Sequence, residues 1–314
     1  MSEVSLQAAR TQTATTGLLK TRRRKTDLVG IGFVLPFLIV YAVFLIWPVI
    51  LGLRMSFFNW TISGAGASDF MGLANYQQVF ADADFWHALG VTFLFTVIST
   101  PLLVIVALAL ALLVNRAIPA KALFRTVFFA PFVLPVSVVA LIWNWLYQPG
   151  FGLINGILTG LGLKEVGWLS DANVALMAVI IMTIWWTIGF NFVLFLAGMQ
   201  QIPVELNESA SLDGAGAWAR IRHITIPLLS KTTSLIIILQ VIASLQVFQQ
   251  AYLLFGGSDG PNFSTRSAVQ YIYETGFTTF RVGLASAMSY ILFILILIVS
   301  IGQFVLLNRE GRKA

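Results

Sequence analysis

Six long stretches of the sequence contain no Asp, Glu, Lys or Arg, and this feature limits the possible folds more than any other. The stretches are Leu28–Leu53, Ala88–Asn115, Thr126–Leu163, Ala172–Val204, Thr232–Ser258 and Val282–Asn308. Each is longer than the roughly 20 apolar residues with which a helix crosses a hydrocarbon core of about 30 Å. Because no water pairs with backbone groups there, only helices or a closed barrel can span a membrane, and continuous apolar runs favour helices. The sequence therefore predicts an all-α integral membrane protein with six transmembrane helices.

The predicted spans leave no room for a separate soluble domain. The longest loop between them, 54–88, has 35 residues, too few to bury a core of its own. We expect a basic N-terminal tail at 1–27, one transmembrane domain at 28–308 and a short C-terminal tail at 309–314. The expected spans are Leu28–Leu53, Leu89–Val114, Thr126–Leu146, Asn173–Met199, Leu228–Phe255 and Leu284–Leu307.

The positions of the basic residues predict the orientation of the chain. Two tails and two alternate loops, all on one side of the predicted membrane, hold 15 of the 19 Lys and Arg residues. Loops rich in Lys and Arg stay in the cytoplasm, so both termini are expected there. The first apolar run is too long for a cleaved signal peptide, which predicts that it is retained as a helix.

Charge and cysteine content narrow the classes of function. The net charge of +6 is explained by the topology, so it does not indicate a nucleic-acid partner. The chain contains no Cys, which excludes disulfides, thiolate metal sites and a Cys nucleophile. It also lacks the G-x-x-x-x-G-K-[ST] pattern that cradles nucleotide phosphates, so any energy from ATP must come through a partner.

One predicted cytoplasmic loop, residues 200–227, has an unusual pattern for a connection between two spans, and we call it the elbow. Pro203 suits the first turn of a helix, and the acidic Glu205 and Glu208 suit its positive end. Gly214, after Asp213, suits the left-handed conformation that often ends a helix. A second helical stretch is expected at Ala215–Arg222, with Trp218 and Ile221 on one side and Arg220 and Arg222 exposed. Together these signals predict a helix, a turn and a second helix between two membrane spans.

The elbow resembles the EAA loop of membrane subunits of binding-protein-dependent ATP-binding-cassette importers. That pattern is Glu-Ala-Ala, three residues, Gly, nine residues, Ile, one residue and Leu-Pro. Here Glu208-Ser209-Ala210 is followed by Gly214 and Ile224-Thr225-Ile226-Pro227, with both spacings intact. Ser209 and Ile226 depart from the pattern, and both are small or isosteric changes. The alternative is an amphipathic helix that lies on lipid.

Other segments extend the resemblance to permeases of the maltose-type sugar importers, and to the first of their two permease chains. These segments are Phe70–Tyr76, Gly257–Thr265, Tyr271–Tyr273 and Ala285–Ser289. The resemblance implies a type I importer permease bundle in a bacterial or archaeal cytoplasmic membrane, whose elbow is a coupling helix that docks in a cleft of an ATPase. The residues expected to couple transport to the ATPase are Glu205, Glu208, Ser209, Ala210, Asp213, Gly214 and Ala215.

The same resemblance implies the partners. They are a second, related permease, two ATPase subunits that bind ATP and Mg, an extracytoplasmic solute-binding protein, the lipid bilayer and a sugar substrate. No cofactor is expected on this chain. The cargo remains open between a sugar and glycerol-3-phosphate or another polar solute.

Polar residues in the fourth and fifth spans are candidates for the solute path. Gln240 and Ser244 are four residues apart and share one helix face, and Asn191 and Thr187 lie on the fourth span beside Trp186. In the family that this chain resembles, the two helices next to the elbow line the sugar site. The alternative for Gln240 and Ser244 is hydrogen bonding between helices.

Two other classes of function remain as alternatives. A proton- or sodium-coupled secondary transporter is disfavoured because the central spans hold no ionisable residue and the chain shows no internal repeat. An intramembrane enzyme needs acidic or His clusters near a membrane face, and Asp82, Asp84 and His87 form the one compact group. The favoured interpretation of these three residues is a solvated segment before a helix. Neither His residue has a second ligand nearby in sequence, so no metal site is expected.

Overall fold

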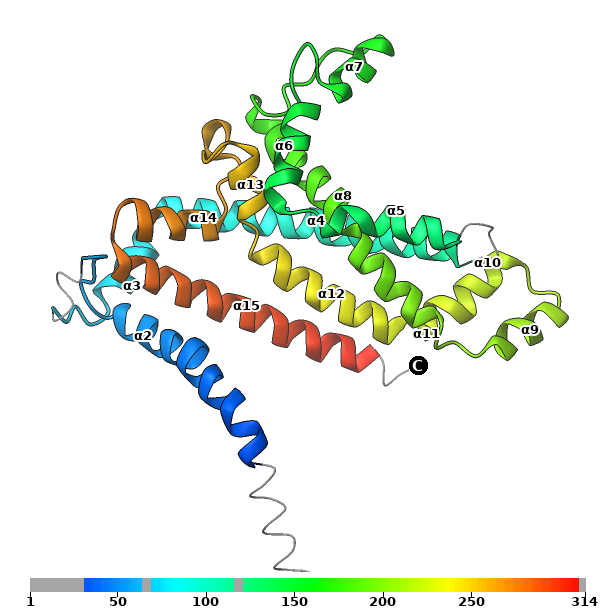
Figure 1. Ribbon diagram of the computed structural model, residues 1–314, viewed down its shortest axis with the longest axis horizontal. Helices are drawn as coiled ribbons and strands as arrows, with labels where there is room; N and C mark the ends of the chain where they lie inside the picture. Colours follow the sequence, from blue (N-terminus) through cyan, green and yellow to red (C-terminus); the bar gives the residue numbers. More distant parts are fainter. Residues whose placement is uncertain (1–30, 64–68, 116–120, 311–314) are drawn as a thin grey trace, which may run out of the picture. The chain divides into compact units, whose positions relative to one another are not determined.

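The computed structural model describes residues 31–63, 69–115 and 121–310, which form two compact units divided after Met55 (Figure 1). The basic residues of the tail 1–27, which decide the predicted orientation, lie outside the described residues, as do Arg116 and residues 311–314. Apart from one isolated bridge between Phe58 and Phe70, the regular elements in these ranges are all helical.

The first unit contains one described helix, Ile31–Met55, which is long and apolar enough to cross a membrane. It includes a π-helical turn, η1 (Ala42–Ile46), and continues as α2 (Trp47–Met55). Pro48 follows this turn and has no N–H to donate to the preceding turn, a common setting for a widened helix.

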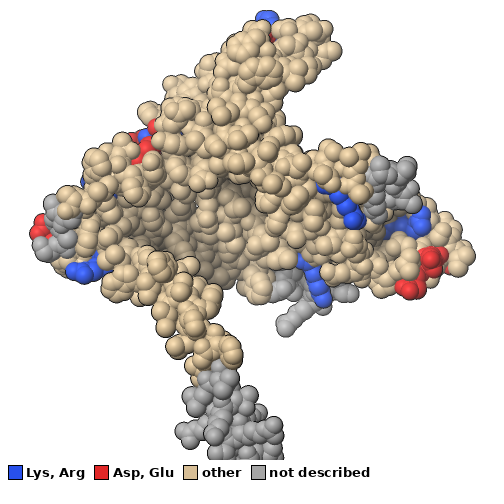
Figure 2. All heavy atoms as spheres, viewed as in Figure 1, with Lys and Arg blue, Asp and Glu red and all other residues tan. Residues whose placement is uncertain are grey.

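The second unit is a helical bundle whose longest members are α4, α8, α12 and α15 (Figure 1). α4 packs against α8 and α12, α12 against α15, and α5 against α8. Red and blue atoms gather mainly toward the helix ends, and uncharged surface dominates between them (Figure 2). The elements are α3 (Ala74–Ala81), α4 (Ala83–Val114), α5 (Lys121–Val133), α6 (Val136–Leu146), α7 (Leu153–Gly160), α8 (Ala172–Met199), α9 (Val204–Leu212), α10 (Ala217–Arg220), η2 (Ile221–Thr225), α11 (Ile226–Leu228), α12 (Ser230–Leu245), α13 (Gln249–Leu254), η3 (Pro261–Phe263), α14 (Ala268–Tyr273), η4 (Glu274–Thr278) and α15 (Val282–Glu310).

The described helices are compatible with six spans, but two of the six are bent. Four single helices are long and apolar enough to cross a membrane, and two bent pairs raise the number to six if each pair is one span. The third predicted span, Thr126–Leu146, is therefore wrong as one straight helix, because α5 and α6 meet at 99°. Pro135 explains the break, since it donates no N–H and its ψ of 141° is extended rather than helical.

The fifth predicted span, Leu228–Phe255, is also interrupted. Its first part bends by 64° near Leu229, and α12 then ends at Leu245, with a gap of three residues before α13 begins at Gln249. No Pro or Gly lies in that gap. Instead, α13 packs against α6, and Asn144 donates from Nδ2 to the carbonyl oxygen of Leu254 at 3.1 Å. Tertiary contacts therefore override the continuous apolar pattern.

Small residues allow the helices of the second unit to approach closely. A Cβ added to Gly189 on α8 would lie 2.3 Å from the carbonyl oxygen of Phe128 on α5, so only glycine fits there. Gly198 makes a similar approach to Thr232 on α12. On α4, Thr92 is fully buried and accepts from the backbone N–H of Ala268 at 2.8 Å. These contacts fix α5 and α12 against α8, and α14 against α4.

A charged cluster lies where α4 and α14 meet, at the end of α4 far from the elbow. Arg266, 6% exposed, pairs with Asp84 at 3.1 Å and with Asp259 at 3.7 Å. Gln270 donates from Nε2 to Asp259 at 2.5 Å and to Glu274 at 3.1 Å. Burial and the neighbouring carboxyl group of Asp259 raise the pKa of Glu274 to about 7. The cluster ties the connection between α13 and α15 to the start of α4.

Candidate functional site

The first arm of the elbow is α9, and its ends follow the sequence signals. Pro203 occupies the position before the helix, and Asp213 caps its end. Gly214 then takes a φ of +78°, which is left-handed. The N–H of Gly214 donates to Ser211 O at 3.2 Å, and the N–H of Ala215 donates to Ala210 O at 2.9 Å. This pair of bonds is a Schellman motif, so the predicted stop at Gly214 is confirmed.

The second arm differs from the prediction of a short helix at Ala215–Arg222. It begins two residues later, at Ala217, because Gly216 before it is extended. It continues beyond Arg222 through η2 and α11, where the N–H of Ile226 bonds back to Ile221 in a π-helical turn. Pro227 follows this turn, as Pro48 follows η1. The second arm is thus a continuous helical path from the turn toward α12.

The predicted coupling residues lie together on α9 and the turn, and most of them are exposed. Glu205, Glu208, Ser209, Asp213 and Gly214 are exposed, whereas Ala210 and Ala215 are half-buried beneath them. α9 has no buried residue, and its apolar Leu212 is 90% exposed. In Figure 1, α9 projects from the end of the second unit. A helix on which both carboxylates and apolar side chains are exposed is typical of a protein-docking surface.

Three of the predicted path residues form one buried network, which we call the polar seam. Asn191 on α8 donates from Nδ2 to Gln240 Oε1 on α12 at 3.1 Å, and Gln240 donates from Nε2 to Ser244 Oγ at 3.2 Å. Ser244 also lies 3.3 Å from the hydroxyl of Thr100 and 3.4 Å from that of Ser99, both on α4. The seam therefore joins three helices, in agreement with the alternative of hydrogen bonding between helices.

The other two predicted path residues, Trp186 and Thr187, make separate contacts. Trp186 donates from Nε1 to the carbonyl oxygen of Leu134 at 3.2 Å, at the bend between α5 and α6. Thr187 donates to the carbonyl oxygen of Thr183 within its own helix at 2.7 Å. Sequence reasoning missed Thr100 and Leu134. The run Ser99-Thr100-Pro101 inside a span is the one signal that pointed to a polar contact on α4.

The described residues offer no arrangement for catalysis by a metal. Among them, no three His, Cys, Asp or Glu side chains lie close enough to hold a metal ion. Asp82, from the acidic group near the start of α4, has structural contacts. It caps α4 by accepting from the N–H groups of Asp84 and Phe85, and it accepts from the hydroxyl of Tyr271 at 2.8 Å.

The fold is similar to that of solved ABC transporter chains. A chain from the crystal structure of a bacterial ABC transporter involved in the import of the acidic polysaccharide alginate matches with a TM-score of 0.80 at 24% identity, covering 93% of this chain and 98% of the other. A chain from the complex of that kind of transporter with an alginate pentasaccharide-bound periplasmic protein matches with a TM-score of 0.76. At this identity the likeness establishes the fold, a type I importer permease bundle.

Sequence comparisons establish the family. Residues 104–311 match the family described as binding-protein-dependent transport system inner membrane component. The probable ABC transporter permease protein YurN of Bacillus subtilis is 34% identical, covering 86% of this chain and 93% of the relative. The trehalose/maltose transport system permease protein MalF of Thermococcus litoralis is 34% identical, covering 90% and 93%. The chain therefore belongs to the binding-protein-dependent transport system inner membrane components, and it is a multi-pass membrane permease subunit of an ABC transporter rather than an enzyme.

Proposed function

We propose that this permease carries a sugar, delivered by a solute-binding protein, through a path that it forms with a second permease. Two ATPase subunits that bind ATP and Mg supply the energy through the elbow. Both termini lie in the cytoplasm, because the elbow then faces the ATPases. The observation that carries the proposal is the exposed α9, which is held between α8 and α12 and ends at the left-handed Gly214.

The elbow has the mechanical properties that coupling requires. Its first arm follows α8 after only four residues, 200–203, and its second arm runs through α11 into α12. At the base, Gly198 on α8 lies against Thr232 on α12 and against Leu229, which is buried. A movement of α9 by a docked ATPase would therefore shift α8 and α12 together. These two helices carry the polar seam.

The cargo follows from the relatives and from the chemistry of the spans. Among the relatives are the trehalose/maltose permease already described and a sulfoquinovosyl glycerol transport system permease protein, SmoG of Agrobacterium fabrum, which is 32% identical. α8 and α12 hold one charged side chain, Lys231, in the first turn of α12. An uncharged path with amide and hydroxyl groups suits a neutral, hydroxyl-rich solute. Glycerol-3-phosphate remains the second candidate, because an sn-glycerol-3-phosphate permease, UgpA, is 31% identical.

The polar seam is closed in this structure, and we infer that it opens during transport. In the open state Asn191, Gln240 and Ser244 would exchange their partners for sugar hydroxyl groups. Trp186 and Thr187 lie on the same helix as Asn191, and we assign their ring face and hydroxyl to the wall of the path. The exchange replaces one set of hydrogen bonds by another, so it needs little energy beyond the separation of the helices.

The test is uptake of labelled sugar into proteoliposomes that contain both permeases and the ATPase subunits, with the binding protein outside and ATP inside. Uptake should require ATP, the binding protein and an intact elbow. Gly214→Pro should abolish it, because proline cannot adopt a φ of +78°. Uptake by this chain alone without an ATPase would instead indicate a secondary transporter, and wild-type uptake by Gly214→Pro would remove the coupling role.

A further inference from the structure

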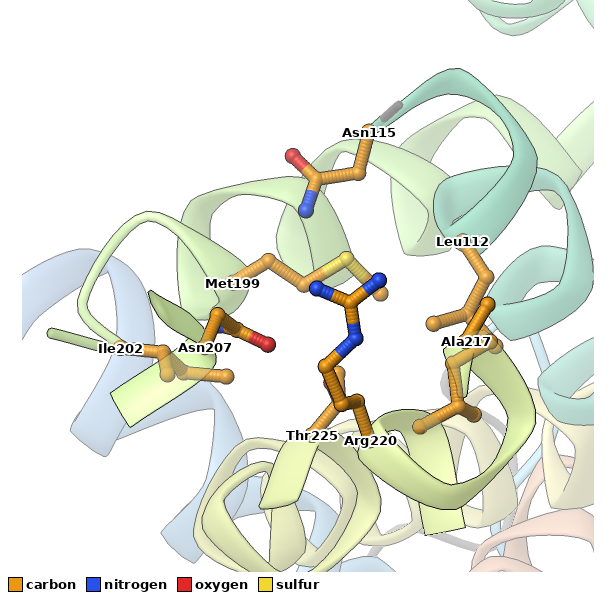
Figure 3. A pocket seen from close by; sticks show the side chains of 9 residues that line it. Leu112, Asn115, Met199, Ile202, Asn207, Ala217, Arg220 and Thr225 are labelled. Carbon is orange, nitrogen blue, oxygen red and sulfur yellow. The ribbon is translucent and has the colours of Figure 1, made fainter. Parts of the chain in front are cut away.

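A cavity of about 290 Å³ lies behind the elbow, and its polar lining is rich in hydrogen-bond donors (Figure 3). The walls come from the last turns of α4 and α8, from α9, and from α10 with η2. Leu112 and Met199 contribute apolar lining, and Asn115, Asn207, Arg220 and Thr225 contribute polar lining. No Asp or Glu lines the cavity, so Arg220 gives it a positive charge.

The sequence predicted an exposed Arg220. In the structure, its side chain instead points into this cavity. Figure 3 shows its guanidinium group in the middle of the space, between the amide groups of Asn115 and Asn207. Among the described residues, no ion pair or hydrogen bond joins the Arg220 side chain to another residue. A guanidinium offers five N–H donors and no acceptor. All five therefore lack a partner among the described residues.

Two neighbours of Arg220 can add donors to the same space. The Asn207 amide, on α9, and the Thr225 hydroxyl, on η2, line the same cavity and make no side-chain hydrogen bond to other described residues. Thr225 as a whole residue is 9% exposed. A forked cation with extra amide and hydroxyl donors matches a phosphate or carboxylate, because such groups accept several charge-assisted hydrogen bonds at once.

The ends of α4 and α8 explain why a lone arginine is tolerated here, but they do not use its donors. The carbonyl ends of helices carry partial negative charge, which favours a nearby cation. Asn115 caps the end of α4, and Met199 is the last residue of α8, so both helix ends face Arg220. The dipoles stabilise the charge at a distance and leave its hydrogen-bonding capacity unfilled.

We propose that this cavity is a binding site for a phosphate-type oxyanion, which would join α4, α9 and α10 and stiffen the base of the elbow. The site lies apart from the polar seam and does not depend on the proposed sugar or coupling roles. Two sources share this chemistry, because the cavity lies at the ends of α4 and α8. They are the phosphodiester headgroup of an anionic lipid and a soluble phosphate.

The experiment compares the assembled transporter in nanodiscs of phosphatidylcholine with and without phosphatidylglycerol, and with inorganic phosphate replacing chloride at constant ionic strength. The readout is the thermal unfolding midpoint, which a ligand raises when it binds the folded state alone. Arg220→Gln is the test variant. Arg222→Gln is its matched control, since it removes the same charge from an exposed position two residues away.

Phosphatidylglycerol, inorganic phosphate or both should raise the midpoint of the wild type and of Arg222→Gln. Arg220→Gln should weaken the apparent affinity by about tenfold or more, because it removes the charge-assisted bonds. A response to phosphatidylglycerol alone assigns a lipid headgroup, and a response to phosphate assigns a soluble anion. If neither raises the wild-type midpoint, or if Arg220→Gln responds as Arg222→Gln does, the proposal is overturned.

A second variant keeps the test decisive if Arg220→Gln does not fold. Asn207→Asp retains Arg220 and places a carboxylate in the same cavity, where it can accept from the guanidinium. It should therefore fold and lose the response to the oxyanion. An undiminished response in Asn207→Asp would show that the anion binds elsewhere.

Discussion

Asn191 on α8 and Gln240 on α12 are joined amide to amide across 3.1 Å, with exposed fractions of 2% and 9%. Both side chains are buried, and Gln240 also donates to Ser244 within α12. The pair connects the two helices that flank the elbow. Its strength therefore affects both the stability of the bundle and the ease with which α8 and α12 separate.

We expect a measurable coupling energy between these two residues. The single changes Asn191→Leu and Gln240→Leu each leave a buried amide group without its partner. In a double-mutant cycle on thermal unfolding, the coupling should lie near the 0.6 to about 1.7 kcal/mol found for hydrogen bonds between membrane helices. Thr187→Val serves as the control, because the Thr187 hydroxyl bonds within its own helix. Strictly additive effects of the two changes would show that the bond contributes nothing.

Gly214 and Gly216 provide a matched pair of glycines at the turn of the elbow. A Cβ at either position meets no atom within 4 Å, so substitution by alanine tests the backbone alone. Gly214 has a φ of +78°, at which an L-residue costs roughly 1–2 kcal/mol, whereas Gly216 has a φ of −66°. ATP-driven uptake should therefore fall in Gly214→Ala and stay near wild type in Gly216→Ala. Equal activities would mean that the turn does not set the position of α9.

Much of the fold was predictable because the relevant signals are local. Charge-free stretches located the membrane helices, and Pro203, Asp213 and Gly214 located the ends of α9. The 99° bend had a partial signal in Pro135, although periodicity alone favoured one continuous span. No sequence signal marks the break before α13, because that break is set by the packing of α13 against α6 and by the hydrogen bond from Asn144.

The candidate site was predictable only in part, for a related reason. Gln240 and Ser244 share a helix face, so their proximity followed from helical geometry. Their link to Thr100 joins residues 144 positions apart, and no periodicity reveals such a contact. The direction of Arg220 likewise depends on where α4 and α8 end. Long-range contacts of this kind are fixed by the packing of helices rather than by local sequence.

Trp186 should stabilise the bend between α5 and α6. The N–H of Val138 bonds to Pro135 O at 3.0 Å rather than to Leu134 O, four residues back. The Leu134 carbonyl oxygen accepts from Trp186 Nε1. Trp186→Phe keeps an aromatic ring and removes this donor. The bond is half-buried, and a typical hydrogen bond contributes about 0.5–1.5 kcal/mol, so the free energy of unfolding should fall by that order. Trp185→Phe is the control, since the Trp185 indole is 37% exposed and its ring is replaced by another ring. A similar loss in both variants would indicate ring volume rather than the hydrogen bond.

The charged cluster should make stability depend on pH through Glu274. Burial, with the carboxyl group of Asp259 beside it, raises the pKa of Glu274 from 4.5 to about 7, despite the hydrogen bond from Gln270 and the charge of Arg266. The folded state therefore holds a proton that the unfolded state releases, so this contribution to stability is fully present below pH 4.5 and is lost as pH rises through about 7. The unfolding midpoint of the wild type should fall over that range, and Glu274→Gln, which is neutral at every pH, should show a flatter profile. Glu165→Gln, an exposed carboxylate beside the Gly150 N–H, should behave as the wild type does. A Glu274→Gln profile that falls as steeply as that of the wild type would place the titrating group elsewhere.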